Sequence, residues 1–148
     1  MAGGAEKELA AFMAKYDPKI AKLGKAAFAH MQARLPGAVS LVYDNYNALA
    51  IGFGPEGKAP PLSIALYPRW INLFFLFGVG LPDPDKLLKG TGSRVRSIRI
   101  DRVDQLNDPH IDALITSAVL HAGWKLEPGA KNKVVIQSIS PNQRPRRP

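Results

Sequence analysis

The sequence predicts an α+β fold, in which two N-terminal helices and a closing C-terminal helix pack on an antiparallel sheet of about five strands as a two-layer sandwich. Three observations support this class. Apolar residues recur at helical spacing within residues 5–35, short β-type runs alternate with turn residues within 38–77, and helical spacing returns after residue 108. The 148 residues correspond to the length of one domain.

Two helices are predicted at residues 5–15 and 18–35. Asp17 is a suitable N-cap for the second helix, and Pro18 suits its first helical position. The apolar residues of this helix recur at spacings of three or four: Ile20, Leu23, Ala27, Met31 and Leu35. This stripe is the face that we expect against the core.

Four β-type runs follow, at residues 39–43, 48–53, 62–67 and 70–77. A turn at Asp44-Asn45-Tyr46-Asn47 separates the first two, and Pro68-Arg69 separates the last two. Connections this short permit only antiparallel neighbours, so the runs are expected to form an antiparallel sheet. Alternation over residues 94–100 predicts a fifth strand.

Asp108-Pro109 opens the last predicted helix, with Asp108 as N-cap and Pro109 in the first turn. That helix runs to about Gly123. We expect an α+β domain over residues 1–126 and a C-terminal extension over 127–148.

Within the extension, residues 133–139 are β-type and could pair at a sheet edge. Residues 141–148 hold three prolines and three arginines and have no apolar anchor, so this basic tail is predicted to be disordered.

The composition excludes several kinds of site. The chain has no cysteine, so it contains no disulfide, thiolate zinc site, iron–sulfur cluster or cysteine nucleophile. The N-terminus has no apolar signal core, and the longest apolar stretch, residues 70–81, is shorter than the roughly 20 residues that span a bilayer. We therefore expect a cytoplasmic protein without a membrane partner. The net charge is +8, and residues 125–148 contribute six basic groups against one acid.

Residues 41–53, 63–70 and 87–100 carry a pattern that resembles the YdhG-like domain family of bacterial proteins, a family named as a domain of unknown function. The likeness covers roughly residues 5–124. It implies a compact α+β domain with helices packed on an antiparallel sheet.

The family is distantly linked to frataxin-like proteins, which implies iron handling as one alternative function. Iron delivery of that kind uses a clustered acidic surface. The first helical region has only Glu6, Glu8 and Asp17 as acids, among lysines.

A Gly-rich stretch over residues 89–96 is the first candidate ligand site. Its glycines let backbone N–H groups approach a ligand, which suits a phosphate or carboxylate. The side chains that would contribute are Lys89, Thr91, Ser93, Arg94 and Arg96. The alternatives are a Gly-rich turn with solvated basic groups and a charged edge strand.

The turn at Tyr43, Asp44, Asn45 and Tyr46 is the second candidate, because pockets often combine aromatic and polar side chains. Turn chemistry alone also accounts for Asp and Asn there.

Nothing in the sequence indicates a cofactor, a metal site or a catalytic constellation. His110 and His121 are eleven residues apart on one helix, about 16 Å, so they cannot share a metal. We expect no catalytic residue and lean toward a non-enzymatic protein.

Three functions therefore remain. The leading one is a small binding domain for an anionic small molecule or a partner, using the two candidate sites. The second is a nucleic-acid-associated protein whose tail residues Arg144, Arg146 and Arg147 contact phosphates, or an acidic protein, weakly. The third is iron handling by analogy with the frataxin-like relatives.

Overall fold

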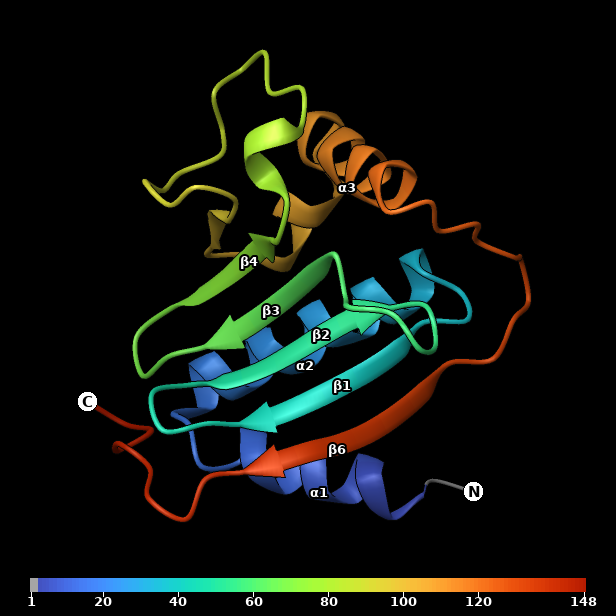
Figure 1. Cartoon of the computed structure of the whole chain (residues 1–148). Coiled ribbons are helices and arrows are strands. Elements are labelled where there is room, and N and C mark those ends of the chain that lie inside the picture. Colours follow the sequence, from blue (N-terminus) through green and yellow to red (C-terminus); the bar gives the residue numbers. More distant parts are fainter. Residues whose placement is uncertain (1–2) are drawn as a thin grey trace.

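A computed structural model describes residues 3–148 of the chain. It is an α+β fold with three α-helices and one six-stranded sheet. Two helices, α1 (Gly4–Met13) and α2 (Pro18–Arg34), lie behind the sheet in Figure 1 and cover one of its faces. The predicted class is confirmed at this level, but the sheet and the placement of the last helix differ from the prediction.

The strands are β1 (Val39–Asp44), β2 (Leu49–Gly54), β3 (Leu62–Leu66), β4 (Ile71–Phe75), β5 (Arg96–Ile100) and β6 (Lys133–Ile139). Their order across the sheet is β5-β4-β3-β2-β1-β6. The first five pair antiparallel, as their short connections require, whereas β6 pairs parallel to β1. The expected all-antiparallel sheet of about five strands was therefore wrong, because the extension adds a parallel sixth strand.

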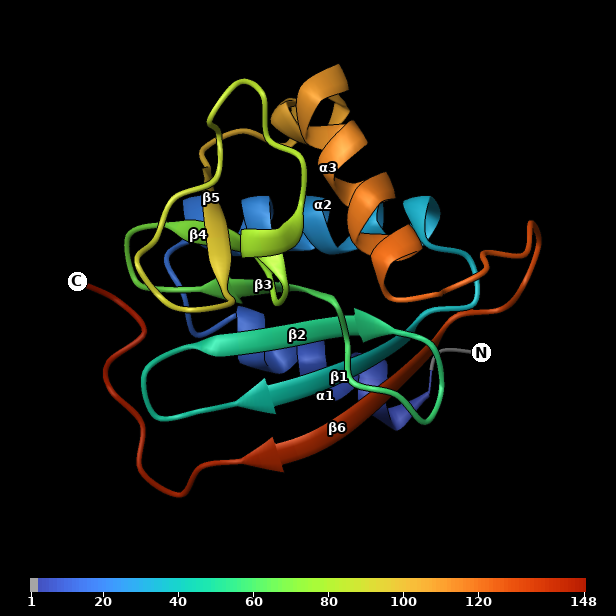
Figure 2. The same ribbon diagram turned by 45° about the horizontal axis from the view of Figure 1, so that its top comes forward.

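The third helix, α3 (Pro109–His121), begins as its sequence predicts, since the side chain of Asp108 accepts a hydrogen bond from the backbone N–H of His110. It lies beyond the β4 side of the sheet (Figures 1 and 2), and Arg34 at the end of α2 pairs with its Asp112 at 2.8 Å. The chain then crosses to the opposite edge to form β6, so this helix does not close the fold.

Strict alternation along the strands builds the core. Leu49, Ile51 and Phe53 of β2 are all fully buried on the helix-covered face. The residues that pair with them on β3 are also apolar and fully buried. Tyr16, between the two N-terminal helices, is also buried. Its hydroxyl donates to the Leu66 carbonyl at 2.7 Å and accepts from the Leu49 N–H at 3.1 Å, which ties the helices to β2 and β3.

The C-terminal extension is attached at both ends of β6. Before the strand, the Asn132 amide accepts from the Gly37 N–H at 2.8 Å and donates to the Gln32 carbonyl at 2.9 Å. After it, residues 140–148 run along the β1–β2 turn toward α1 (Figure 1). Among residues 141–148, Arg146 alone is buried, and its side chain bonds Asp44. Disorder of these residues stays a prediction.

Candidate functional site

The face of the sheet opposite α1 and α2 is not covered by a helix (Figure 2). Pairing of the strands places Tyr43, Ala50, Ala65, Asn72 and Arg99 on one rung across this face, from β1 to β5. On β2 and β3, most of the side chains that point to this face are small. We call this surface the open face.

A groove of about 490 Å³ lies on the open face, above β2 and β3 and beside the β1–β2 turn. Ala48, Ala50 and Ala65 leave its floor low, because they carry one methyl group each. Its walls combine aromatic rings with uncharged polar groups: Tyr46, Tyr67, Phe74, Asn45, Asn47, Ser63 and Ser140. Tyr46 is 53% exposed, so it is accessible to a ligand.

The wall on the β3–β4 side is stiffened by ring stacking. Tyr67 stacks on Trp70 with ring centroids 5.1 Å apart, and the Arg99 guanidinium lies 5.9 Å from the Trp70 ring. Burial raises the pKa of the Tyr67 hydroxyl, so this group stays protonated and can donate a hydrogen bond at neutral pH.

Two exposed arginines belong to segments around the rim of the groove. Arg99 is on β5, on the same open-face rung as Ala50 and Ala65, and it pairs with Asp101 at 3.1 Å. The backbone N–H of Arg144 donates to the Tyr46 carbonyl at 2.8 Å, and the Arg144 side chain is exposed. No charged side chain lines the groove itself.

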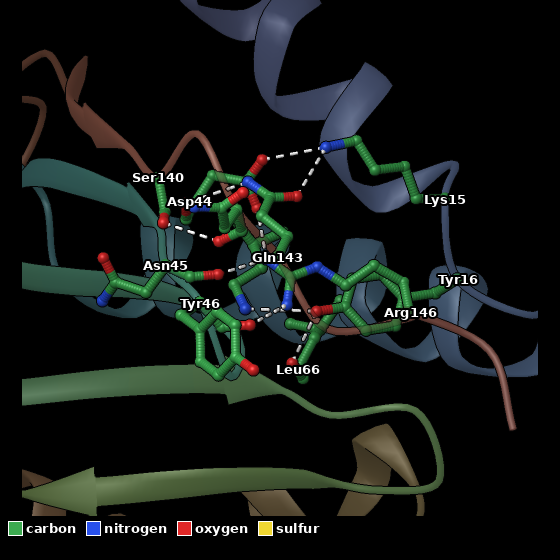
Figure 3. Close-up of polar contacts among 11 residues, drawn as sticks. Lys15, Tyr16, Asp44, Asn45, Tyr46, Leu66, Ser140, Gln143 and Arg146 are labelled. Atoms are coloured by element: carbon green, nitrogen blue, oxygen red, sulfur yellow. Dashed lines mark hydrogen bonds and ion pairs between the residues drawn. The ribbon is translucent and has the colours of Figure 1, made fainter.

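Asp44 does not belong to the groove, although Asn45 and Tyr46 do. Successive strand residues point to opposite faces, and the Asp44 side chain turns to the helix-covered face, where it is 1% exposed. There it pairs with Lys15 at 3.0 Å and with Arg146 at 2.9 Å (Figure 3). Burial disfavours its charged form, but hydrogen bonds from Gln143, Lys15 and Arg146 outweigh burial and hold the pKa of this carboxyl below its ordinary value.

The Gly-rich candidate site at residues 89–96 is not assembled with the candidate site at Tyr43, Asp44, Asn45 and Tyr46. Arg96 begins β5, four strands from β1, which is roughly 19 Å at the usual strand spacing. Its side chain shares the face of Ile98 and Ile100, whereas Tyr43 and the groove belong to the opposite face. The sequence could not show this, because the order of strands in the sheet does not follow from local pattern.

The geometry of this Gly-rich loop also differs from that of an anion-binding loop. The Arg96 guanidinium donates to the carbonyls of Gly92 and Val95 at 2.5 and 2.8 Å, so the loop presents acceptors to its own arginine. The backbones of Lys89 and Ser97 bond each other in both directions. Thr91, Ser93 and Arg94 are exposed around this turn.

Of the three tail arginines, Arg146 is 5% exposed and engaged with Asp44, and Arg144 and Arg147 remain exposed. Arg147 donates to the Lys15 carbonyl at 3.1 Å. A nucleic acid that bound to this tail as it stands would meet two arginine side chains instead of three.

Within residues 3–148, no group of three or more potential metal-ligating side chains comes together. His110 pairs with Asp85 alone. The same residues contain no helix long and apolar enough to cross a membrane.

A second hollow, of about 410 Å³, lies between α3 and the segment after it, where it is lined by Leu120, Trp124 and Leu126. Its cations are Lys125 and Arg34, and Arg34 is already engaged, because the Nε donates to Asp112 and an Nη to Thr116. The open-face groove combines accessible aromatic rings with amide and hydroxyl groups, and we take it as the candidate site.

Sequence reasoning found Asn45 and Tyr46 in this groove but missed Ser63, Tyr67, Phe74 and Ser140. The sequence did contain a pattern that indicates two of them, because Ser63 and Tyr67 alternate with the apolar core residues of β3. Ser140 carried no signal, since it reaches the groove only through the parallel pairing of β6.

The fold and the groove define a small α+β domain with one open sheet face. No family model, no curated protein and no solved structure matches the chain. Membership of the YdhG-like family therefore stays a prediction.

Proposed function

We propose that this chain is a non-enzymatic binding domain for a small anionic molecule that carries a planar ring, and that the ring occupies the open-face groove. The observation that carries the proposal is the lining of the groove, with accessible aromatic walls, a floor of methyl groups and amide and hydroxyl groups between them. None of these groups is a nucleophile paired with a base, which favours binding over catalysis.

The low floor suits a flat ligand. A ring lying on Ala50 and Ala65 would contact the side chains of Tyr46 and Tyr67, and the amides of Asn45 and Asn47 can each donate and accept. Aromatic contact of this kind is worth about 1 kcal/mol beyond the area it buries.

The rim supplies the charge selectivity. A phosphate or carboxylate attached to the ring would reach Arg144 or Arg99 at the rim, and both are exposed. Nucleoside monophosphates and aromatic carboxylates have this combination of ring and anion.

The test is a thermal-shift panel of nucleoside monophosphates, aromatic carboxylates and sugar phosphates, with Ala50→Leu as the site variant. A ligand at 100 times its Kd adds about 2.7 kcal/mol, which raises the Tm of a chain of this size by about 5–10 °C. Ala50→Leu fills the floor and should abolish that shift.

Ala33→Leu is the matched control, because it makes the same change on the exposed side of α2 and should keep the shift. A ring-bearing ligand whose shift survives Ala50→Leu would contradict the proposed site. The absence of a shift with every panel member would contradict the proposed ligand class.

A further inference from the structure

The hollow beside α3, of about 410 Å³, lies where the end of α2, the end of α3 and the segment after α3 meet. Figures 1 and 2 both show the ends of these two helices close together. We call this cavity the α3 hollow. Its volume is at the lower end of the range of small-molecule sites, which is about 300–1,000 Å³, so its size suits a small ligand. The apolar part of its lining consists of Val119, Leu120, Trp124 and Leu126.

The end of α3 builds one wall of the α3 hollow. Gly123 has a φ of +66°, the left-handed conformation in which helices commonly end at a glycine. The Gly123 N–H donates to the Leu120 carbonyl at 3.0 Å, and the Trp124 N–H donates to the Val119 carbonyl at 3.0 Å. These bonds turn the chain back on the helix and bury Trp124, which is 8% exposed. The wall is therefore held by the backbone and is present without a ligand.

Leu120 borders the α3 hollow and lies mostly in water. It is 72% exposed, more than any other exposed large hydrophobic residue within residues 3–148. A single exposed leucine is ordinary on a protein surface. This leucine, however, shares a hollow with Trp124 and Leu126, so an apolar group bound there would remove all three from water.

The charged part of the lining is entirely positive, because Lys125 and Arg34 line the α3 hollow and none of its lining residues is acidic. Lys125 is exposed and forms no ion pair within residues 3–148. Arg34 is fixed through its Nε by Asp112 at 2.8 Å and through one Nη by Thr116 at 2.6 Å. Apolar side chains with cations beside them complement a molecule that has an apolar chain and an anionic head.

We propose that the α3 hollow binds a medium-chain aliphatic carboxylate. The alkyl chain lies against Leu120, Trp124 and Leu126, and the carboxylate pairs with Lys125. An aliphatic chain needs no amide or hydroxyl partner, and the only hydroxyl of this lining, on Thr116, already accepts a hydrogen bond from Arg34. The site and its ligand differ from the open-face groove and its ring ligand, and the inference does not depend on the proposed function.

The first test is calorimetric titration of the full chain with hexanoate, octanoate and decanoate. Each added methylene group should tighten binding about fourfold until the hollow is full, because each is removed from water. Octanol has the same apolar chain without the charge and should bind about fivefold more weakly than octanoate. In the Trp70→Phe variant, Trp124 is the only tryptophan, and its fluorescence should change when octanoate binds.

The second test reverses one charge of the lining. Lys125→Glu should weaken octanoate binding about tenfold, because repulsion replaces attraction, and should leave octanol binding unchanged. Lys131→Glu is the matched control, since Lys131 is an exposed lysine further along the same segment and does not line the hollow. Its effect on octanoate should be less than about twofold, because water and salt screen a more distant charge. Lys125 is exposed, so both variants should keep the Tm of the wild type.

Three results would overturn the proposal. Equal affinities for octanol and octanoate would show that the cations do not select an anion. Octanoate binding that survives Lys125→Glu and is lost in Ala50→Leu would place the alkyl chain in the open-face groove. Absence of binding by every alkanoate would leave the α3 hollow to an acidic segment of a partner protein.

Discussion

Asp44 is a carboxylate with 1% side-chain exposure and two cationic partners, Lys15 and Arg146. Charges buried in this way are retained only when their partners satisfy them, and removal of one partner costs about 3–5 kcal/mol. Sequence reasoning placed Asp44 in a turn, where Asp is common. Its burial could not be predicted, because the two partners are 29 and 102 residues away along the chain.

The lowered pKa of Asp44 predicts how stability depends on pH. Because the folded-state pKa lies below the unfolded value of about 3.9, the stabilisation is present above that value and is lost as the pH falls through the folded pKa. Asp44→Asn should lower the free energy of unfolding at neutral pH by about 3 kcal/mol and should remove this acid-dependent loss.

Urea unfolding of both proteins between about pH 7 and pH 3 measures the difference. The two stabilities should converge on the acid side. Asp101→Asn is the control, since Asp101 is exposed and paired at the surface. Parallel pH curves for wild type and Asp44→Asn would show that this carboxylate is not stabilised by its partners.

At the level of elements, the sheet edge formed by β5 depends on close backbone contact. The short 3₁₀ helix η1 (Gly78–Gly80) lies against the start of β5, and the Val79 N–H donates to the Arg94 carbonyl at 3.1 Å. A Cβ on Gly78 would meet the Cβ of Arg96 at 2.5 Å and its backbone nitrogen at 3.0 Å. No side chain fits there without moving the strand.

Gly78→Ala should therefore destabilise the protein by about 1–3 kcal/mol through overpacking. Gly80→Ala, two residues along in the same helix, is the matched control, because its added methyl meets nothing nearer than 4.0 Å. Urea denaturation of the two variants gives the comparison. Equal stabilities would mean that η1 can move away from β5 at no cost.

On the scale of the whole molecule, the chain on either side of β6 is held by a polar side chain, in addition to the pairing of the strand with β1. Asn132 fixes the chain before the strand, and Arg146 fixes it after the strand. The strand between them has seven residues, which is roughly 20 Å. Two attachment sites this far apart, with no common partner, should contribute independently to the free energy of unfolding.

Asn132→Ala should cost about 1–3 kcal/mol, because the Gly37 N–H and the Gln32 carbonyl lose their partner. The Asn132→Ala/Arg146→Ala double variant should lose the sum of the two single losses to within about 0.5 kcal/mol. Denaturant titration of the four proteins measures this. A smaller combined loss would mean that release of one end of β6 already releases the other.

Much of the fold was accessible from the sequence because it is local. Helical spacing, the Asp108-Pro109 start of α3 and the short strand connections predicted α1, α2, α3 and the antiparallel pairing of neighbours among β1 to β4. Alternation also separated core positions from open-face positions.

The parts that could not be predicted depend on contacts between distant segments. The parallel pairing of β6 with β1 requires the chain to cross the molecule, and the burial of Arg146 requires a pocket from two other segments. The candidate site was therefore predicted only at Asn45 and Tyr46, where it coincides with a turn.

Alternation in β2 and β3 has a consequence for how such a domain can diversify. Ile51 and Ile64 face the helices, and Ala50, Ser63 and Ala65 face the groove, on the same strands. The side chains that build the core and those that shape the groove therefore stand at separate, interleaved positions. Exchange of a methyl group in the groove for a longer side chain changes the surface of the open face and leaves the core side chains of β2 and β3 in place.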